Sequence, residues 1–239
     1  MMSTQENDKQ TLSFWMTRKG ILLQIIIVLI PSALLLKSGS LLLAGLFISL
    51  ILSTIGLRLR SQTWHDTGLK RPISIRRVLL TAFGWTFALI ILTFTLRHLV
   101  TFMTHEGPNL EAFKPVKGNI KGLLMGLAVA WTFGAFGEEM FFRGFLINAF
   151  YRLLPDSHFK DQVKWGGALV VTSVLVGFGH AYQGITGMIL TGIIAFCFGF
   201  IYLTNKRNLW PSILTHGIYD SVAFILLFTG FSFDQVIKF

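Results

Sequence analysis

Seven long apolar stretches leave this chain few possible folds. Only 13% of its residues are charged, about half the share usual in soluble domains. About 20 apolar residues are needed to cross a bilayer as a helix, and a helix satisfies its own backbone hydrogen bonds there. The sequence therefore predicts an all-α, polytopic bundle of 7–8 transmembrane spans, forming one membrane domain over 20–239 after a polar tail over 1–19. The apolar stretches are about 20–36, 41–57, 78–96, 122–153, 165–182, 185–204 and 211–230.

The fourth stretch is longer than a membrane requires. If it were helical throughout, its 32 residues would reach ~48 Å, against a hydrocarbon core of ~30 Å. It is either one long tilted helix or two helices broken near 134–144. A break there would supply an eighth span.

Basic residues gather at one set of chain connections. With the N-terminus in the cytoplasm, 14 Lys and Arg lie on the cytoplasmic side and 6 on the other. This bias predicts a cytoplasmic N-terminus, and it explains the net charge of +10 by contact with anionic lipids rather than nucleic acid. The single cysteine, Cys197, excludes a disulfide framework or a cysteine-based metal site within one chain.

Three charged residues interrupt the fourth stretch: Glu138, Glu139 and Arg143. Each costs roughly 2.5–3.5 kcal/mol at the centre of a membrane helix, so they form an ion-pair network or carry out chemistry. Glu139 and Arg143 are four residues apart and able to pair. Glu138, rotated by about 100° from Glu139 on an α-helix, continues a stripe of small residues that favours close helix packing, so it is expected to face a neighbouring helix. The stripe comprises Gly126, Ala130 and Gly134.

Two later stretches add ionisable side chains. His180 lies among glycines near the end of the fifth, and His216 and Asp220 lie four apart in the seventh. A carboxylate with two imidazoles is suited to activating water and stabilising an oxyanion. The same residues would suit a metal site formed by Glu138, His180 and His216, with zinc as one divalent ion of choice. Ionisable residues within spans are also typical of proton-coupled transporters.

With these residues placed, the chain resembles the CAAX protease and bacteriocin-processing family, also called the Abi or type II CAAX prenyl endopeptidase-like family. The family's motif Glu-Glu-x-x-x-Arg is met by Glu138, Glu139 and Arg143. Its motif Phe-x-x-x-His is met in part, because Val176 precedes His180. Its third motif, His-x-x-x-Asn or Asp, is met by His216 and Asp220, and the resemblance covers about 122–221.

The resemblance implies an intramembrane endopeptidase of glutamate or metallo type in a bacterial cytoplasmic membrane. By analogy Glu138 activates water with the aid of His180, His216 and Asp220 stabilise the oxyanion, and Glu139 with Arg143 supports the site. An ionised Asp220 would repel an oxyanion, so it is either protonated or orients His216. The partners implied are membrane lipids and a peptide with a membrane-proximal cleavage site, prenylated or, more in keeping with bacterial members, a leader peptide. A non-catalytic immunity or envelope partner is the alternative, and a transporter a further one.

Overall fold

Helices make up most of the described part of the chain, which in the computed structural model covers residues 14–35, 41–72 and 74–231. Seven of the helices described there are long and apolar enough to cross a membrane, which confirms the predicted polytopic bundle. Much of the tail expected over 1–19, and the turn expected over 37–40, lie outside the described residues. The long elements are α2 (Arg18–Leu35), α3 (Leu42–Leu59), α4 (Ile75–Thr104), α5 (Ile120–Val129), η3 (Ala130–Leu146), α6 (Ile147–Leu153), α7 (Asp161–Gly179), α8 (Gly184–Thr204) and α9 (Leu209–Thr229).

Polar side chains fix where several helices begin. The Ser74 hydroxyl accepts a hydrogen bond from the Arg77 amide at the start of α4. Asn119 accepts from two amides at the start of α5, and Asn208 accepts from the Trp210 amide at the start of α9. Such caps satisfy amides that have no partner inside the helix. This cap fixes the start of α4 at Ile75. The helix ends at Thr104, eight residues beyond the end expected from hydropathy.

The fourth stretch is one continuous span from Ile120 to Leu153 rather than two broken helices. Its middle, η3, is a π-helix, and the Ile147 amide bonds to the Phe142 carbonyl five residues back. π-Helical hydrogen bonds from i to i+5 are rare and occur frequently at functional sites. Because a π-helix turns by less per residue than an α-helix, the 100° step expected between Glu138 and Glu139 does not hold.

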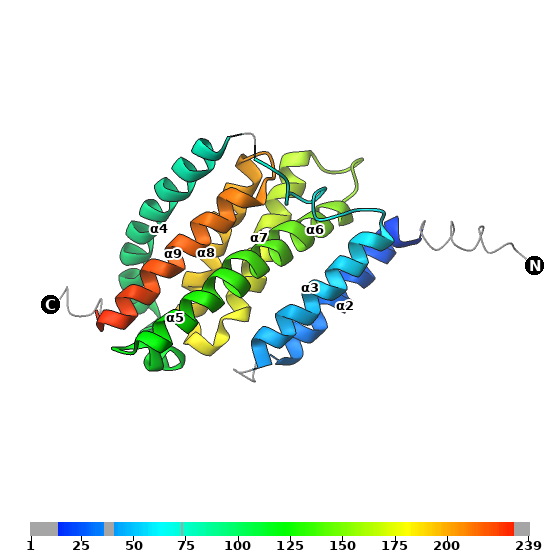
Figure 1. Cartoon of the computed structure of the whole chain (residues 1–239). Coiled ribbons are helices and arrows are strands. Elements are labelled where there is room, and N and C mark those ends of the chain that lie inside the picture. Colours follow the sequence, from blue (N-terminus) through cyan, green and yellow to red (C-terminus); the bar gives the residue numbers. More distant parts are fainter. Residues whose placement is uncertain (1–13, 36–40, 73, 232–239) are drawn as a thin grey trace, which may run out of the picture.

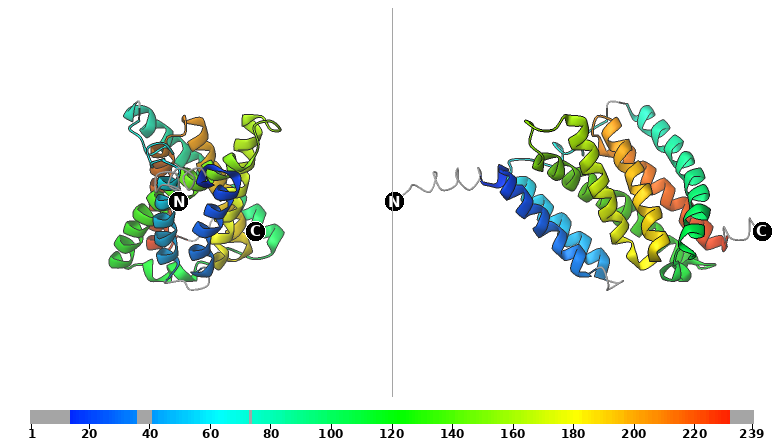
Figure 2. Two further views of the ribbon diagram at one scale, coloured as in Figure 1. Left: turned by 90° about the vertical axis from the view of Figure 1, so that its right-hand side faces the viewer. Right: turned by 180° about the vertical axis from the view of Figure 1, so that it is seen from behind.

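Two groups of helices surround this central span (Figure 1). Helices α2 and α3 run side by side along η3 and α6, with the Ser32 and Ser49 hydroxyls 2.9 Å apart between them. Helices α9 and α7 contact the span on its other side, and α4 and α8 pack against these two, as the view from behind in Figure 2 shows. The span therefore contacts both groups, and side chains on η3 reach the middle of the bundle.

Glycines bring α9 close to the central span. A Cβ atom on Gly217 would lie 2.6 Å from the Trp131 ring, and one on Gly126 would lie 2.4 Å from the Phe224 ring. Trp131 also donates a hydrogen bond from Nε1 to the Ser221 hydroxyl at 3.0 Å. Gly126 thus faces a neighbouring helix, as its place in the small-residue stripe suggested.

Candidate active site

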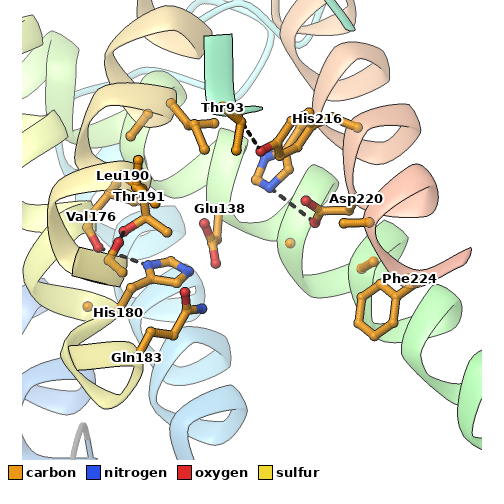
Figure 3. Close-up of a pocket in the computed structure, with 18 of the residues that line it drawn as sticks. Thr93, Glu138, Val176, His180, Gln183, Leu190, Thr191, His216, Asp220 and Phe224 are labelled. Atoms are coloured by element: carbon orange, nitrogen blue, oxygen red, sulfur yellow. Dashed lines mark hydrogen bonds and ion pairs between the residues drawn. The ribbon is translucent and has the colours of Figure 1, made fainter. Parts of the chain in front are cut away.

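A cavity of about 620 Å³ lies between the two groups of helices. Most of its lining is apolar, as is usual for a site that binds a ligand. Its ionisable lining includes the four residues expected to carry out chemistry: Glu138, His180, His216 and Asp220. Three separate spans supply them, and Figure 3 shows Glu138 between His180 on one side and His216 with Asp220 on the other.

His180 follows the last residue of α7, where its ring is fixed by the backbone. Its Nδ1 lies 2.9 Å from the Val176 carbonyl oxygen. A carbonyl accepts hydrogen bonds only, so Nδ1 carries a hydrogen, and in the neutral ring the lone pair is then on Nε2. Val176, the departure from the aromatic motif position, therefore supplies a backbone acceptor that does not depend on its side chain.

His216 is held between two carboxylates. Its Nδ1 is hydrogen-bonded to Glu139 Oε1 at 3.0 Å, and its Nε2 lies 3.4 Å from Asp220 Oδ2. The ring also stacks on Phe198, with centroids 4.4 Å apart and planes 18° apart. The ring is thus oriented along both edges and on one face.

Glu139 and Arg143 form an ion pair next to this histidine, and both are buried. Arg143 Nη1 is 3.0 Å from Glu139 Oε1, the oxygen that also meets His216, and Arg143 Nη2 donates to the Ala195 carbonyl. One carboxylate oxygen therefore connects η3, α9 and, through Arg143, α8. Charges buried this far are tolerated because each has a partner.

Gly134 leaves room for the carboxylate of Asp220. A Cβ atom at this position would lie 3.2 Å from Asp220 Oδ2 and 3.8 Å from His216 Nε2. Gly134 therefore faces α9 at the site, and it lines the cavity together with Glu138, one step along the stripe.

Several lining residues were not anticipated from the sequence. Gln183 lies beside His180 in Figure 3, and it donates a hydrogen bond to the Tyr182 hydroxyl at 3.1 Å. The Tyr219 hydroxyl lies 2.8 Å from the Thr93 hydroxyl on α4. The closeness of Gln183 to His180 in sequence was a usable signal, but nothing in the apolar stretch around Phe198 indicated that it would stack on His216.

A comparison with known families bears on this arrangement. Residues 119–222 match the Rce1-like type II CAAX prenyl endopeptidase family model. All six motif residues lie inside the matched segment, so the resemblance stated from the motifs is confirmed there. At the level of the family, the Rce1-like match implies intramembrane protease activity. Searches of curated proteins and of solved structures found no match to the chain.

The Rce1-like segment does not assemble the metal ligand set considered from the sequence. Both ring nitrogens of His216 face carboxylates, which leaves neither free for an ion shared with Glu138 and His180. Within the described ranges, no three His, Cys, Asp or Glu side chains are grouped so that they could hold a metal ion. In this arrangement, then, the residues do not fit a zinc site.

Proposed function

We propose that this protein is an intramembrane endopeptidase that hydrolyses a peptide bond near the membrane surface. The observation that carries the proposal is that Glu138, His180, His216 and Asp220, from three spans, line one largely apolar cavity. An apolar cavity excludes bulk water while a few polar groups orient the reactants. The Rce1-like match adds the expectation of proteolysis at the family level.

In this proposal Glu138 and His180 activate the attacking water. The carboxylate of Glu138 and the lone pair on His180 Nε2 both accept hydrogen bonds, and both residues line the same space. A water donating to both has its own lone pairs directed at a substrate carbonyl. As the water oxygen bonds to the carbonyl carbon, its proton passes to Glu138, which then delivers it to the amine nitrogen as the carbon–nitrogen bond breaks.

His216 is assigned the developing oxyanion, and Asp220 acts through it. At 3.4 Å the His216 Nε2 to Asp220 Oδ2 contact is long, so a hydrogen on Nε2 can be shared with an oxyanion. Asp220 is then a positioning residue that holds the ring, which avoids the repulsion between a carboxylate and an oxyanion. Glu139 holds the opposite edge of the ring.

Cleavage by the purified protein tests the proposal. The protein in detergent is offered peptide and prenyl-peptide libraries, and products are identified by mass spectrometry. We expect Glu138→Gln to abolish cleavage while Glu111→Gln, on an exposed glutamate outside the cavity lining, cleaves like the wild type. Undiminished cleavage by the Glu138→Gln protein would overturn the mechanism. Full complementation of a deletion phenotype by Glu138→Gln would instead favour the non-catalytic partner.

A further inference from the structure

The cavity reaches the connections at one end of the bundle, and we take that end as its mouth. Lining residues come from the segment between α4 and α5, from the turn between α7 and α8, and from the first turn of α3. Examples are Pro108, Phe113, Gln183 and Leu42. Among the described residues, none that line it belong to the connections at the other end, 60–74, 154–160 and 205–208. Figure 1 shows these two sets of connections at opposite ends of the helices.

The end without the mouth is the basic one. Among the described residues, the connections and helix ends there carry 13 Lys and Arg, against 4 at the end with the mouth. The remaining one is the buried Arg143. An excess of Lys and Arg in short connections marks the cytoplasmic side of a membrane protein. The mouth therefore lies on the side away from the cytoplasm.

The mouth is a built part of the fold. The Asn109 amide donates a hydrogen bond to the Gln183 carbonyl at 2.8 Å, which ties the segment after α4 to the turn that follows His180. The Thr186 hydroxyl donates to the Glu106 carbonyl at 2.6 Å. These bonds fix the frame around His180 on the mouth side.

From this arrangement we propose that the site takes substrates from the non-cytoplasmic face. Its substrate would be a peptide segment next to an apolar membrane anchor, presented after translocation. This assignment rests on the protease function proposed above. It restricts the substrates to peptides presented on the non-cytoplasmic side. A CAAX sequence that is prenylated in the cytoplasm would be presented at the opposite face, away from the mouth.

Cysteine labelling in oriented vesicles tests the side of the mouth without any assay of activity. In a Cys197→Ala background, which removes the single cysteine, we would compare Glu111→Cys near the mouth with Ser157→Cys at the basic end. Both side chains are exposed, and neither belongs to the cavity lining. A membrane-impermeant maleimide should label Glu111→Cys in right-side-out vesicles and Ser157→Cys only in inside-out vesicles. The reverse pattern, or labelling of both from one side, would overturn the proposal.

A pair of reporters then tests the substrate side. The peptide cleaved in detergent is placed next to a single membrane span, either at its cytoplasmic end or at its non-cytoplasmic end. We expect cleavage of the second reporter only, and its loss with Glu138→Ala. Cleavage of the first reporter would overturn the substrate assignment. If detergent yields no cleaved peptide, the protease function and the substrate assignment fail together, while the labelling result still decides which side the mouth faces.

Discussion

Glu139 Oε1 and His216 Nδ1 are 3.0 Å apart, and this contact joins the central span to α9 at the wall of the cavity. The two residues are 77 positions apart in the chain, and both are buried. A carboxylate at Nδ1 keeps a hydrogen on that nitrogen and fixes which way the ring points. We therefore propose that Glu139 positions His216 in addition to pairing with Arg143.

Removing Glu139 separates these two roles. Glu139→Ala leaves Arg143 as a buried charge without its carboxylate, so we expect a loss of about 3–5 kcal/mol in the free energy of unfolding. Combining Glu139→Leu with Arg143→Met removes both charges and should recover most of that loss. Because His216 would still lack its acceptor, we expect kcat to stay about 10–100-fold low. Thermal unfolding in detergent and steady-state kinetics check this, and wild-type kcat in the stable double variant would contradict the positioning role.

A substitution at Gly134 tests Asp220 without replacing any of the proposed catalytic residues. In Gly134→Ala the new Cβ would lie 3.2 Å from Asp220 Oδ2, so the carboxylate has to move. Since only the end of a side chain is displaced, we expect stability to change by less than about 1 kcal/mol while kcat falls. Gly166→Ala is the matched control because no heavy atom lies within 4 Å of its new methyl group. Equal activity in the two variants would show that the position of Asp220 does not matter.

The contact between Gly217 and Trp131 controls how closely α9 approaches the central span. A methyl group 2.6 Å from the ring cannot be accommodated without movement, so Gly217→Ala should destabilise the protein by about 1–3 kcal/mol. The shift would also break the hydrogen bond from Trp131 to Ser221. Gly84→Ala, whose methyl group would meet open space, should be neutral or stabilising by up to about 1 kcal/mol. Thermal unfolding of the two variants side by side is the measurement, and an equally stable Gly217→Ala protein would speak against close packing there.

Arg60, just after α3, is expected to lower the stability of the folded protein. It is 2% exposed, its guanidinium lies 4.9 Å from the centre of the Phe145 ring, and none of its three side-chain nitrogens has a hydrogen-bond partner. Burial, with a smaller effect of Arg152, lowers its pKa to about 10. Replacing it by an apolar side chain of similar length, Arg60→Met, should therefore raise stability by about 1–3 kcal/mol.

The pH dependence of that gain follows from the lowered pKa. A guanidinium that loses its proton more easily in the folded state costs stability below pH 10, and the cost shrinks as pH rises through the folded pKa. The advantage of Arg60→Met should therefore be constant near neutral pH and narrow above pH 10. The exposed Arg58→Met serves as the control, with an expected change within about 0.5 kcal/mol. Chemical denaturation at several pH values checks both, and a destabilised Arg60→Met would mean that the charge has a favourable role.

Metal removal tests the ligand geometry. Because both nitrogens of His216 face carboxylates, we expect a chelator to leave the cleavage rate unchanged. Metal analysis of the same sample before and after treatment provides the control. Loss of activity that zinc restores would show that the side chains rearrange around an ion.

Sequence reasoning predicted the fold and part of the site because those features depend on local composition. The lengths of the apolar stretches were enough to predict the seven spans. The four-residue spacing of Glu139 and Arg143 agrees with their 3.0 Å ion pair. Spacing carried no sign that Glu139 also contacts His216, since that contact depends on how α9 packs against η3. The rotation between Glu138 and Glu139 was misjudged because α-helical geometry was assumed where the backbone is π-helical.

The depths of His180 and His216 also could not be reconciled from the sequence. Straight spans put His180 near the mouth end and His216 only ~8 Å from the basic end, which made their meeting hard to explain. In the structure the cavity extends across this difference, and Glu138 lies between the two histidines. The two rings need not share a depth, because each one faces a different side of the carboxylate.

The π-helix makes residue count over 130–146 as important as residue identity. With hydrogen bonds running from i to i+5, the direction of each side chain depends on how many residues the segment contains. Deleting one residue ahead of Glu138 would shift the phase of the helix and bring its neighbour Glu139, the partner of Arg143, towards the cavity. The number of residues in this segment therefore sets which side chain faces the cavity. We expect a single deletion here to reduce activity more than most single substitutions on the lipid-facing side of the segment.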